Sequence, residues 1–145
     1  DGTSEQVRKA IAVATAAHSG QVDKSGQPYI EHPLRVMRRV IGQDPILGTI
    51  AVLHDVIEDT DITAERLSKQ FGPRVVDAVI ALTHSSEESR QDYYQRIKAN
   101  PDALVVKLAD IDDNTDPKRL AILDDETREQ LMKKYADAKT ALAAS

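Results

Sequence analysis

The stretch AVLHDVIED, residues 51–59, places an imidazole and three carboxylates inside an apolar run. If the stretch is helical, His54 and Glu58 lie one turn apart on the helix surface. Asp55 and Asp59 have the same spacing in the adjoining row. Burying such groups is unfavourable unless they are paired or bind a metal. The chain must therefore fold so that counter-charges or a metal ion lie against this stretch.

The composition favours helices for the rest of the fold. The chain has 145 residues, which is enough for one domain with its own core. Apolar residues make up 41% and aromatic residues 3%, with no Trp, so the core must be built from Ala, Val, Ile and Leu. This composition suits packed helices. We predict an all-α helical bundle formed by residues 1–145 as a single domain.

Apolar residues recur at three- and four-residue spacing, and Gly, Pro and short polar residues separate these periodic segments. The pattern predicts helices from about 4 to 19, 33 to 42, 45 to 60 and 63 to 71, over 75–82, around 93–97, over 103–114 and around 131–138. The valines of 103–114 would also suit a buried strand, but the length of this run without alternation favours a helix. Segment 20–28 is predicted to be a surface loop.

The charge and the cysteine count limit the partners. Nineteen basic against twenty-four acidic residues give a net charge of −5, which argues against broad binding of polymeric nucleic acid or anionic membranes. No apolar run approaches the roughly 20 residues of a membrane-spanning helix, and no signal-peptide pattern is present. With no Cys there is no thiolate chemistry. We expect a cytoplasmic protein that acts on a small molecule; its oligomeric state is left open.

Four residues in three separated segments are candidate metal ligands. His32 opens one predicted helix, His54 and Asp55 lie on another, and Asp110 sits inside the apolar run 105–111. Each alone is more typical of a structural residue. Two imidazoles and two carboxylates together suit a first-row divalent ion and leave coordination positions open for catalysis. We therefore predict a metal site.

The same residues carry a family resemblance. The motifs HP (32–33), HDVIEDT (54–60) and KLADIDDN (107–114) occur in the order that is typical of HD-domain phosphohydrolases, which they resemble. The segment KSGQPYIEHP (24–33) and the Glu-Asp pair after the His-Asp pair resemble the hydrolase domain of RelA/SpoT homologues and the small alarmone hydrolases. The resemblance runs from about His18 to Asn114.

The resemblance implies an all-helical HD-type fold. It also implies an enzyme that removes the 3′-pyrophosphate of guanosine 3′,5′-bis(diphosphate), (p)ppGpp. It implies one Mn²⁺, or another first-row divalent metal, held by His32, His54, Asp55 and Asp110. Glu58 and Asp59 would then act as catalytic residues on water and the leaving group. Lys24 and Asn114 would contact the substrate.

Two departures from the family pattern leave the substrate open. Asp23 stands where the alarmone hydrolases usually have a basic residue, and Thr115-Asp116-Pro117 replaces residues that help to hold the ribose and base. A carboxylate near a highly anionic nucleotide would repel it. A different phosphorylated metabolite is therefore the alternative substrate.

Less specific interpretations also stay open. Glu58 and Asp59 could be solvated acids at a helix end, and Lys24 a solvated loop lysine. The domain could be a non-catalytic regulator that keeps the metal, or a helical interaction domain in which the buried charges form ion pairs. Further positively charged candidates near the motifs are Arg35, Arg38, Arg39 and Lys107.

Overall fold

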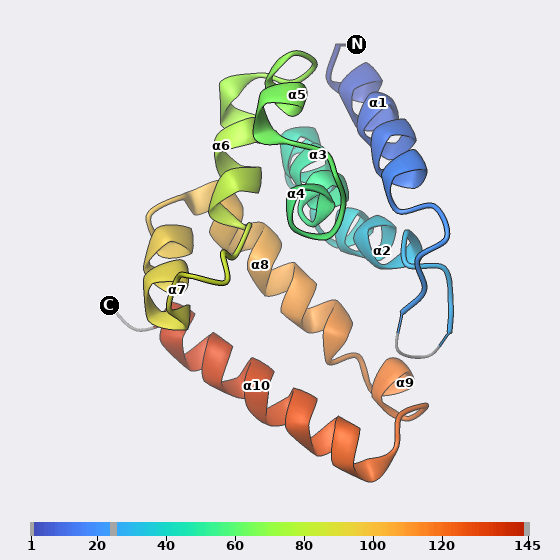
Figure 1. The fold of residues 1–145 in the computed structure, drawn as a ribbon, viewed down its shortest axis with the longest axis vertical. Helices are drawn as coiled ribbons and strands as arrows, with labels where there is room; N and C mark the ends of the chain where they lie inside the picture. Colours follow the sequence, from blue (N-terminus) through green and yellow to red (C-terminus); the bar gives the residue numbers. More distant parts are fainter. Residues whose placement is uncertain (1, 24–25, 144–145) are drawn as a thin grey trace.

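A computed structural model describes residues 2–23 and 26–143, and only the backbone of residues 2–4. In these ranges the regular elements are helices, apart from one isolated antiparallel bridge between Val22 and Pro28, so the all-α prediction is confirmed (Figure 1). The helices are α1 (Gly2–Ala17), α2 (Glu31–Val40), α3 (Pro45–Leu53), α4 (Val56–Asp59), α5 (Ala64–Ser68), α6 (Pro73–Ala81), α7 (Arg90–Lys98), α8 (Pro101–Asn114), α9 (Pro117–Leu120) and α10 (Asp125–Ala143). None of them combines the length and apolar character needed to cross a membrane.

Helix α3 is the centre of the core. It packs against α1, α2, α6 and α8, and every residue from Leu47 to Leu53 is buried. The largest of these side chains are Ile50 and Leu53, both without solvent exposure. Because α3 is apolar on all sides, the polar residues at its C-terminal end are carried into the interior of the protein.

The stretch 103–114, for which a strand was the alternative, lies in helix α8. The side chain of Asn100 accepts a hydrogen bond from the N–H of Ala103, and Pro101 occupies the first turn, where its missing N–H costs nothing. Val106 and Ile111 are fully buried. Helix α8 packs against α2 and α3, which brings the KLADIDDN motif next to the HP and HDVIEDT motifs.

The prediction of one helix over 45–60 is wrong, because the helix is interrupted at His54 and Asp55. In a continuous helix the carbonyl oxygen of Ala51 would accept from the N–H of Asp55. Here it accepts from the side-chain Nδ1–H of His54 at 2.6 Å and from the backbone N–H of His54 at 3.4 Å. The histidine side chain thus takes the place of the helical hydrogen bond, and α4 starts one residue after Asp55.

The predicted loop is a compact turn in its described part. The N–H of Asp23 donates to the carbonyl oxygen of Gln27 at 2.8 Å, and one carboxylate oxygen of Asp23 accepts from the N–H of Gln27 at 3.0 Å. Gly26 lies between them with φ +86°, a conformation that favours glycine. The side chain of Asp23 is therefore held in a defined position.

The chain after α8 turns back sharply and forms two more helices. Asp116 accepts a hydrogen bond from the N–H of Lys118 and caps the four-residue helix α9, where no helix was predicted. Helix α10 then runs back along α8 to α7 (Figure 1). Its buried residues, Ala138 and Leu142, lie in its C-terminal part. The N-terminal half of α10 forms one wall of the pocket described below.

Candidate active site

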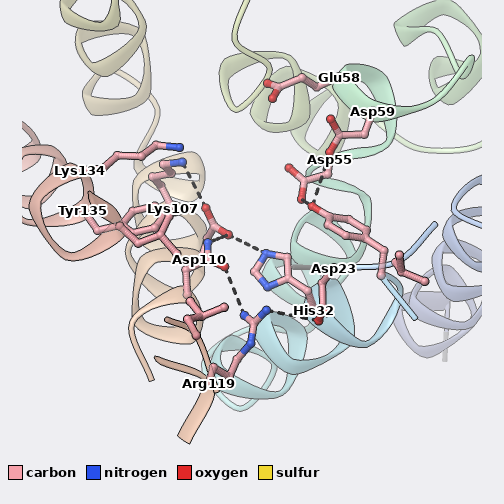
Figure 2. A pocket seen from close by; sticks show the side chains of 15 residues that line it. Asp23, His32, Asp55, Glu58, Asp59, Lys107, Asp110, Arg119, Lys134 and Tyr135 are labelled. Atoms are coloured by element: carbon pink, nitrogen blue, oxygen red, sulfur yellow. Dashed lines mark hydrogen bonds and ion pairs between the residues drawn. The ribbon is translucent and has the colours of Figure 1, made fainter. Parts of the chain in front are cut away.

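Three of the four predicted metal ligands form one buried cluster. His32 is in the first turn of α2, His54 follows the last residue of α3, and Asp110 is in α8. One ligand atom from each lies within 4.8 Å of the others, and all three residues are buried. His32 Nε2 is 2.8 Å from Asp110 Oδ1 (Figure 2). The packing of α8 on α2 and α3 thus unites residues that are far apart in the sequence.

The hydrogen bonds of His54 show that lone pairs converge in this cluster. The carbonyl oxygen of Ala51 only accepts, so the Nδ1 of His54 carries the proton. In the neutral ring Nε2 then carries a lone pair, and this atom is buried without a hydrogen-bond partner. Carboxylate oxygens of Asp55 and Asp110 lie 3.0 and 3.5 Å from it. A cation placed between these atoms would satisfy all three, so the residues fit a divalent metal ion.

The pKa shifts have the same electrostatic origin. Burial alone would lower the pKa of His54, but the carboxylates of Asp55 and Asp110 raise it well above the usual value. Burial also opposes protonation of His32, and its hydrogen bonds to Asp110 and Asp113 more than offset this, so its pKa is raised. The cluster therefore favours positive charge at its centre. A bound divalent ion would supply that charge.

Asp55, the fourth predicted ligand, lies at the edge of the cluster. Its Oδ2 is 3.0 Å from His54 Nε2 and accepts a hydrogen bond from the hydroxyl of Tyr29 at 2.5 Å. Burial would raise the pKa of Asp55, but the neighbouring His54 lowers it, so the side chain stays a carboxylate. Burial, together with the charge of Asp55, raises the pKa of Tyr29, so its hydroxyl stays a donor. Tyr29 therefore orients Asp55 as well as packing the loop.

Glu58 and Asp59, the predicted catalytic acids, line a pocket next to the cluster (Figure 2). Burial, together with the charges of Asp55 and Glu58, raises the pKa of Asp59. Glu58 accepts a hydrogen bond from the backbone N–H of His84 at 2.7 Å. The two acids thus have different surroundings, and Asp59 binds a proton more readily than an ordinary aspartate.

Asp113 supports the cluster and was missed by the sequence reasoning. His32 Nδ1 donates to Asp113 Oδ2 at 2.7 Å, and the carboxylate also accepts from Arg35 at 2.9 Å and Arg119 at 2.9 Å. Burial would raise the pKa of Asp113, but His32 and Arg35 lower it. A carboxylate that binds the far nitrogen of a ligand histidine fixes its tautomer. The sequence signal that could have revealed Asp113 is its position three residues after Asp110, on the same buried side of the helix.

The pocket combines the cluster with cationic and apolar walls. Its volume is about 380 Å³. It is lined by Val22, Asp23, Tyr29, His32, Asp55, Glu58, Asp59, Lys107, Asp110, Asn114, Arg119, Leu123, Leu131, Lys134 and Tyr135. Lys107 donates to Asp110 Oδ2 at 3.2 Å. Leu123, Leu131 and Tyr135 provide apolar surface from α10 and the segment before it. Such a pocket suits a ligand that is anionic at one end and partly apolar elsewhere.

The structure places some of the predicted substrate residues at the pocket and others away from it. Asn114 lines the pocket, and its Nδ2 donates to Asp110 Oδ1 at 3.1 Å, so it also touches the cluster. Lys24 lies outside the described residues. Arg35 and Arg39 bind Asp113 and Asp116 and do not line the pocket, and Arg38 does not line it either. Lys107 does line the pocket.

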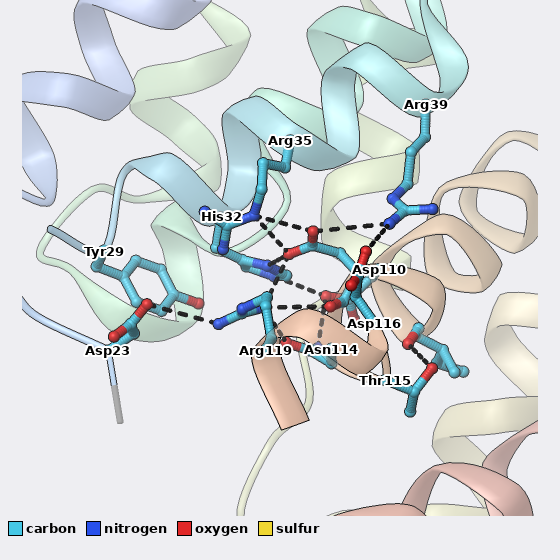
Figure 3. Close-up of polar contacts among 12 residues, drawn as sticks. Asp23, Tyr29, His32, Arg35, Arg39, Asp110, Asn114, Thr115, Asp116 and Arg119 are labelled. Atoms are coloured by element: carbon cyan, nitrogen blue, oxygen red, sulfur yellow. Dashed lines mark hydrogen bonds and ion pairs between the residues drawn. The ribbon is translucent and has the colours of Figure 1, made fainter. Parts of the chain in front are cut away.

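The carboxylate of Asp23 forms an ion pair with Arg119, a residue that was not among the predicted site residues. Asp23 Oδ2 lies 3.5 Å from a terminal nitrogen of Arg119 (Figure 3). The repulsion expected of this carboxylate stays a prediction, and the structure adds that Arg119 is its cationic partner. Nothing in the sequence indicated the pair, since Arg119 reaches the pocket only through the reversal of the chain at Asp116.

Comparison with known proteins places the chain in a family. A family model described as the HD domain matches residues 10–107, about two thirds of the chain. The chain belongs to the HD-domain family. The match contains His32, His54 and Asp55 and ends before Asp110, whose place in the cluster rests on the geometry.

Two curated proteins are similar to this chain over most of its length. A guanosine-3′,5′-bis(diphosphate) 3′-pyrophosphohydrolase of Aquifex aeolicus is 33% identical over 150 residues, which cover 97% of this chain and 21% of that protein. A GTP pyrophosphokinase of Streptomyces coelicolor is 37% identical over 119 residues, covering 74% and 14%. The HD-domain chain thus spans about a fifth or less of these curated relatives.

A solved structure is similar over most of both chains. It is the metazoan SpoT orthologue described as hydrolysing ppGpp, with a TM-score of 0.78 and 26% identity. The alignment covers 96% of this chain and 86% of the chain in that structure. The HD-type helical fold inferred from the sequence motifs is therefore confirmed.

Proposed function

We propose that this HD-domain chain is a metal-dependent phosphohydrolase that removes the 3′-pyrophosphate of (p)ppGpp. The observation that carries the proposal is the buried cluster of His32, His54 and Asp110 beside a pocket that also contains Lys107, Arg119 and Lys134. In this cluster the Nε2 of His54 has no hydrogen-bond partner and faces the carboxylates of Asp55 and Asp110. Hydrolysis of ppGpp consumes one water and yields GDP and pyrophosphate.

The proposed metal is Mn²⁺, with His32, His54, Asp55 and Asp110 as its protein ligands. When bound, such an ion supplies a Lewis acid that acidifies water and offsets phosphoryl charge. Asp113 holds His32 in the tautomer that directs the Nε2 lone pair to the cluster, because it accepts the Nδ1–H at 2.7 Å. The chain thus provides a pre-oriented ligand set.

Proton transfer is assigned to the two acids beside the cluster. Asp59, with its raised pKa, would hold or deliver a proton more readily than an ordinary aspartate. Glu58 is fixed by the N–H of His84 and would orient the attacking water. Lys107 is kept charged by Asp110, which raises its pKa although burial lowers it. Lys107, with Asn114 and the loop residue Lys24, would contact the phosphates.

The relatives support this substrate to different degrees. The protein of Aquifex aeolicus and the metazoan orthologue are both named for hydrolysis of ppGpp. The protein of Streptomyces coelicolor is named as a GTP pyrophosphokinase and not as a hydrolase, but this chain matches 14% of its length. The shared segment contains the HD motifs, and these suit hydrolysis.

One observation favours a second candidate. Asp23 lines the pocket, and its charge reduces the attraction of this wall for a highly anionic nucleotide. A less charged phosphorylated metabolite is therefore the alternative substrate. A regulatory domain without turnover would bind metal but release no phosphate or pyrophosphate.

The test is an assay of the purified chain with Mn²⁺ and a panel of nucleotides and phosphate esters that includes ppGpp. We expect ppGpp to give GDP and pyrophosphate in equal amounts, and the His54→Ala variant to be inactive. Release of single phosphates, or faster use of another metabolite, would replace the proposed substrate. Metal binding without turnover of any compound would support the regulatory domain.

A further inference from the structure

Arg119 has one anchored end and one end that faces the pocket. Its Nη1 donates to Asp113 Oδ2 at 2.9 Å and to Asn114 Oδ1 at 3.3 Å. Its Nη2 lies 3.5 Å from Asp23 Oδ2, whereas charge-assisted hydrogen bonds usually measure about 2.7–2.9 Å. The guanidinium is thus positioned by Asp113 and paired only loosely with Asp23.

Asp23 is restrained by its own loop. Its Oδ1 accepts the N–H of Gln27, and its backbone N–H donates to the carbonyl oxygen of Gln27. Its side chain is 8% exposed. The second carboxylate oxygen is therefore kept near Arg119 and cannot follow the guanidinium far if a different anion approaches it. Asp23 acts as a built-in competitor for that anion.

The pair lies across the cluster from the catalytic acids. Figure 2 shows Asp23 and Arg119 on one side of His32, and Glu58 and Asp59 on the other. A substrate with one phosphoryl group at the cluster, near the two acids, can direct another part of itself toward Arg119. A planar guanidinium binds phosphate oxygens well because its donors form a fixed fork.

We propose that Arg119 binds a second anionic group of the substrate, one that is not cleaved, and that Asp23 limits the strength of this contact. The pair determines specificity: it favours a substrate with a phosphate at both ends over one with a phosphate only at the cleaved end. This inference rests on the proposed function, since it takes the cluster as the place of cleavage.

The test compares two substrates that share the cleaved end. Both ppGpp and guanosine 3′-diphosphate carry the 3′-pyrophosphate, and only ppGpp carries a 5′-pyrophosphate. In Arg119→Gln, which retains a donor for Asp113 but loses the charge, we expect KM for ppGpp to rise roughly tenfold. The KM for guanosine 3′-diphosphate, kcat for both substrates and Mn²⁺ affinity are expected to stay within about twofold of the parent chain.

Two further variants sharpen the test. Asp23→Asn removes the competitor, so KM for ppGpp is expected to fall about threefold while that for guanosine 3′-diphosphate stays the same. Arg39→Gln is the matched control, because Arg39 also binds the Asp113 and Asp116 carboxylates but does not line the pocket. Its kinetic constants are expected to match those of the parent chain for both substrates.

Several results would overturn the inference. These are an equal change of KM for both substrates, no change in either variant, or loss of Mn²⁺ from Arg119→Gln, which would make Arg119 structural. If the parent chain turns over neither compound, the proposed function fails, and calorimetric affinities of the two compounds then test the pair directly. Equal affinities in the parent chain and in Arg119→Gln would then exclude it.

Discussion

The two ends of the pocket are built in different ways. The metal end consists of His32 in α2, His54 directly after α3 and Asp110 in α8, whose side chains are 3–8% exposed and held by several polar partners. The outer end is formed by a loop, the four-residue helix α9 and the part of α10 without buried residues. Reactive groups need fixed positions, and the proposed metal ligands His32, His54 and Asp110 lie in packed helices or directly after one. Arg119, the proposed recognition group, lies on a short connection, where substitutions disturb the core less.

This contrast can be measured. Substitutions at the metal end are expected to lower kcat or metal occupancy, because they change the reacting groups themselves. Substitutions at the outer end are expected to change KM, because they change only how the rest of the substrate is bound. The predictions below run from the largest expected effect to the smallest.

The largest effect is expected from Asp110→Asn, which removes a carboxylate that contacts His32, Lys107 and Asn114. Loss of a metal ligand removes several kcal/mol of transition-state stabilisation, so kcat is expected to fall by about ten-thousandfold or more. Elemental analysis is expected to show reduced metal content. The control is Asp112→Asn on the same helix, where the half-exposed side chain pairs with Lys139; loss of metal there as well would argue against a specific site.

Glu58→Gln and Asp59→Asn are expected to keep the metal and lose turnover. General acid or base groups contribute typically about 10²–10⁴-fold, so kcat is expected to fall by that range while Mn²⁺ affinity is retained. Asp61→Asn, an exposed acid two residues after Asp59, is the matched control. A fully active Glu58→Gln or Asp59→Asn variant would make that residue a solvated surface acid.

Asp113→Asn is expected to have an intermediate effect. The amide cannot supply the negative charge that orients His32 and neutralises Arg35 and Arg119. Substitutions of such supporting carboxylates typically cost about 10–100-fold in metal affinity or activity. Calorimetric titration with Mn²⁺ measures the change. An unchanged affinity together with unchanged kcat would show that His32 needs no support from this carboxylate.

The smallest effect is expected at the outer end. Leu123→Ala removes part of an apolar wall, and about 1 kcal/mol of lost contact corresponds to about a fivefold rise in KM with kcat unchanged. Ile122→Ala is the control, because Ile122 is 67% exposed and does not line the pocket. A large loss of kcat in Leu123→Ala would mean that the two ends are not separable.

Periodicity in the sequence was sufficient to predict most helices, because the apolar residues that create it also form the core. The break at His54 escaped this reasoning, since it depends on one side-chain hydrogen bond to Ala51 that competes with the helix. The valines of α8 were correctly assigned to a helix because their spacing did not alternate. Helix α9 was missed because four residues are too few to show a period.

The site was predictable where it consists of motif residues on helices. His32, His54 and Asp110 come together as expected, while Asp55 stands at the edge of their cluster. Arg119 could not be predicted, because its position depends on how the chain folds back after α8. The cationic partner of Asp23 could not be predicted for the same reason. A charge in a sequence has no assignable effect until its partner in space is known.

The most direct test of the account is a titration of the metal-depleted chain with Mn²⁺ while release of pyrophosphate from ppGpp is followed. The account predicts that activity appears in proportion to bound metal and saturates at one ion per chain. It also predicts that His54→Ala neither binds this ion tightly nor gains activity. Pyrophosphate release that is independent of bound metal, or full metal binding without release, would contradict it.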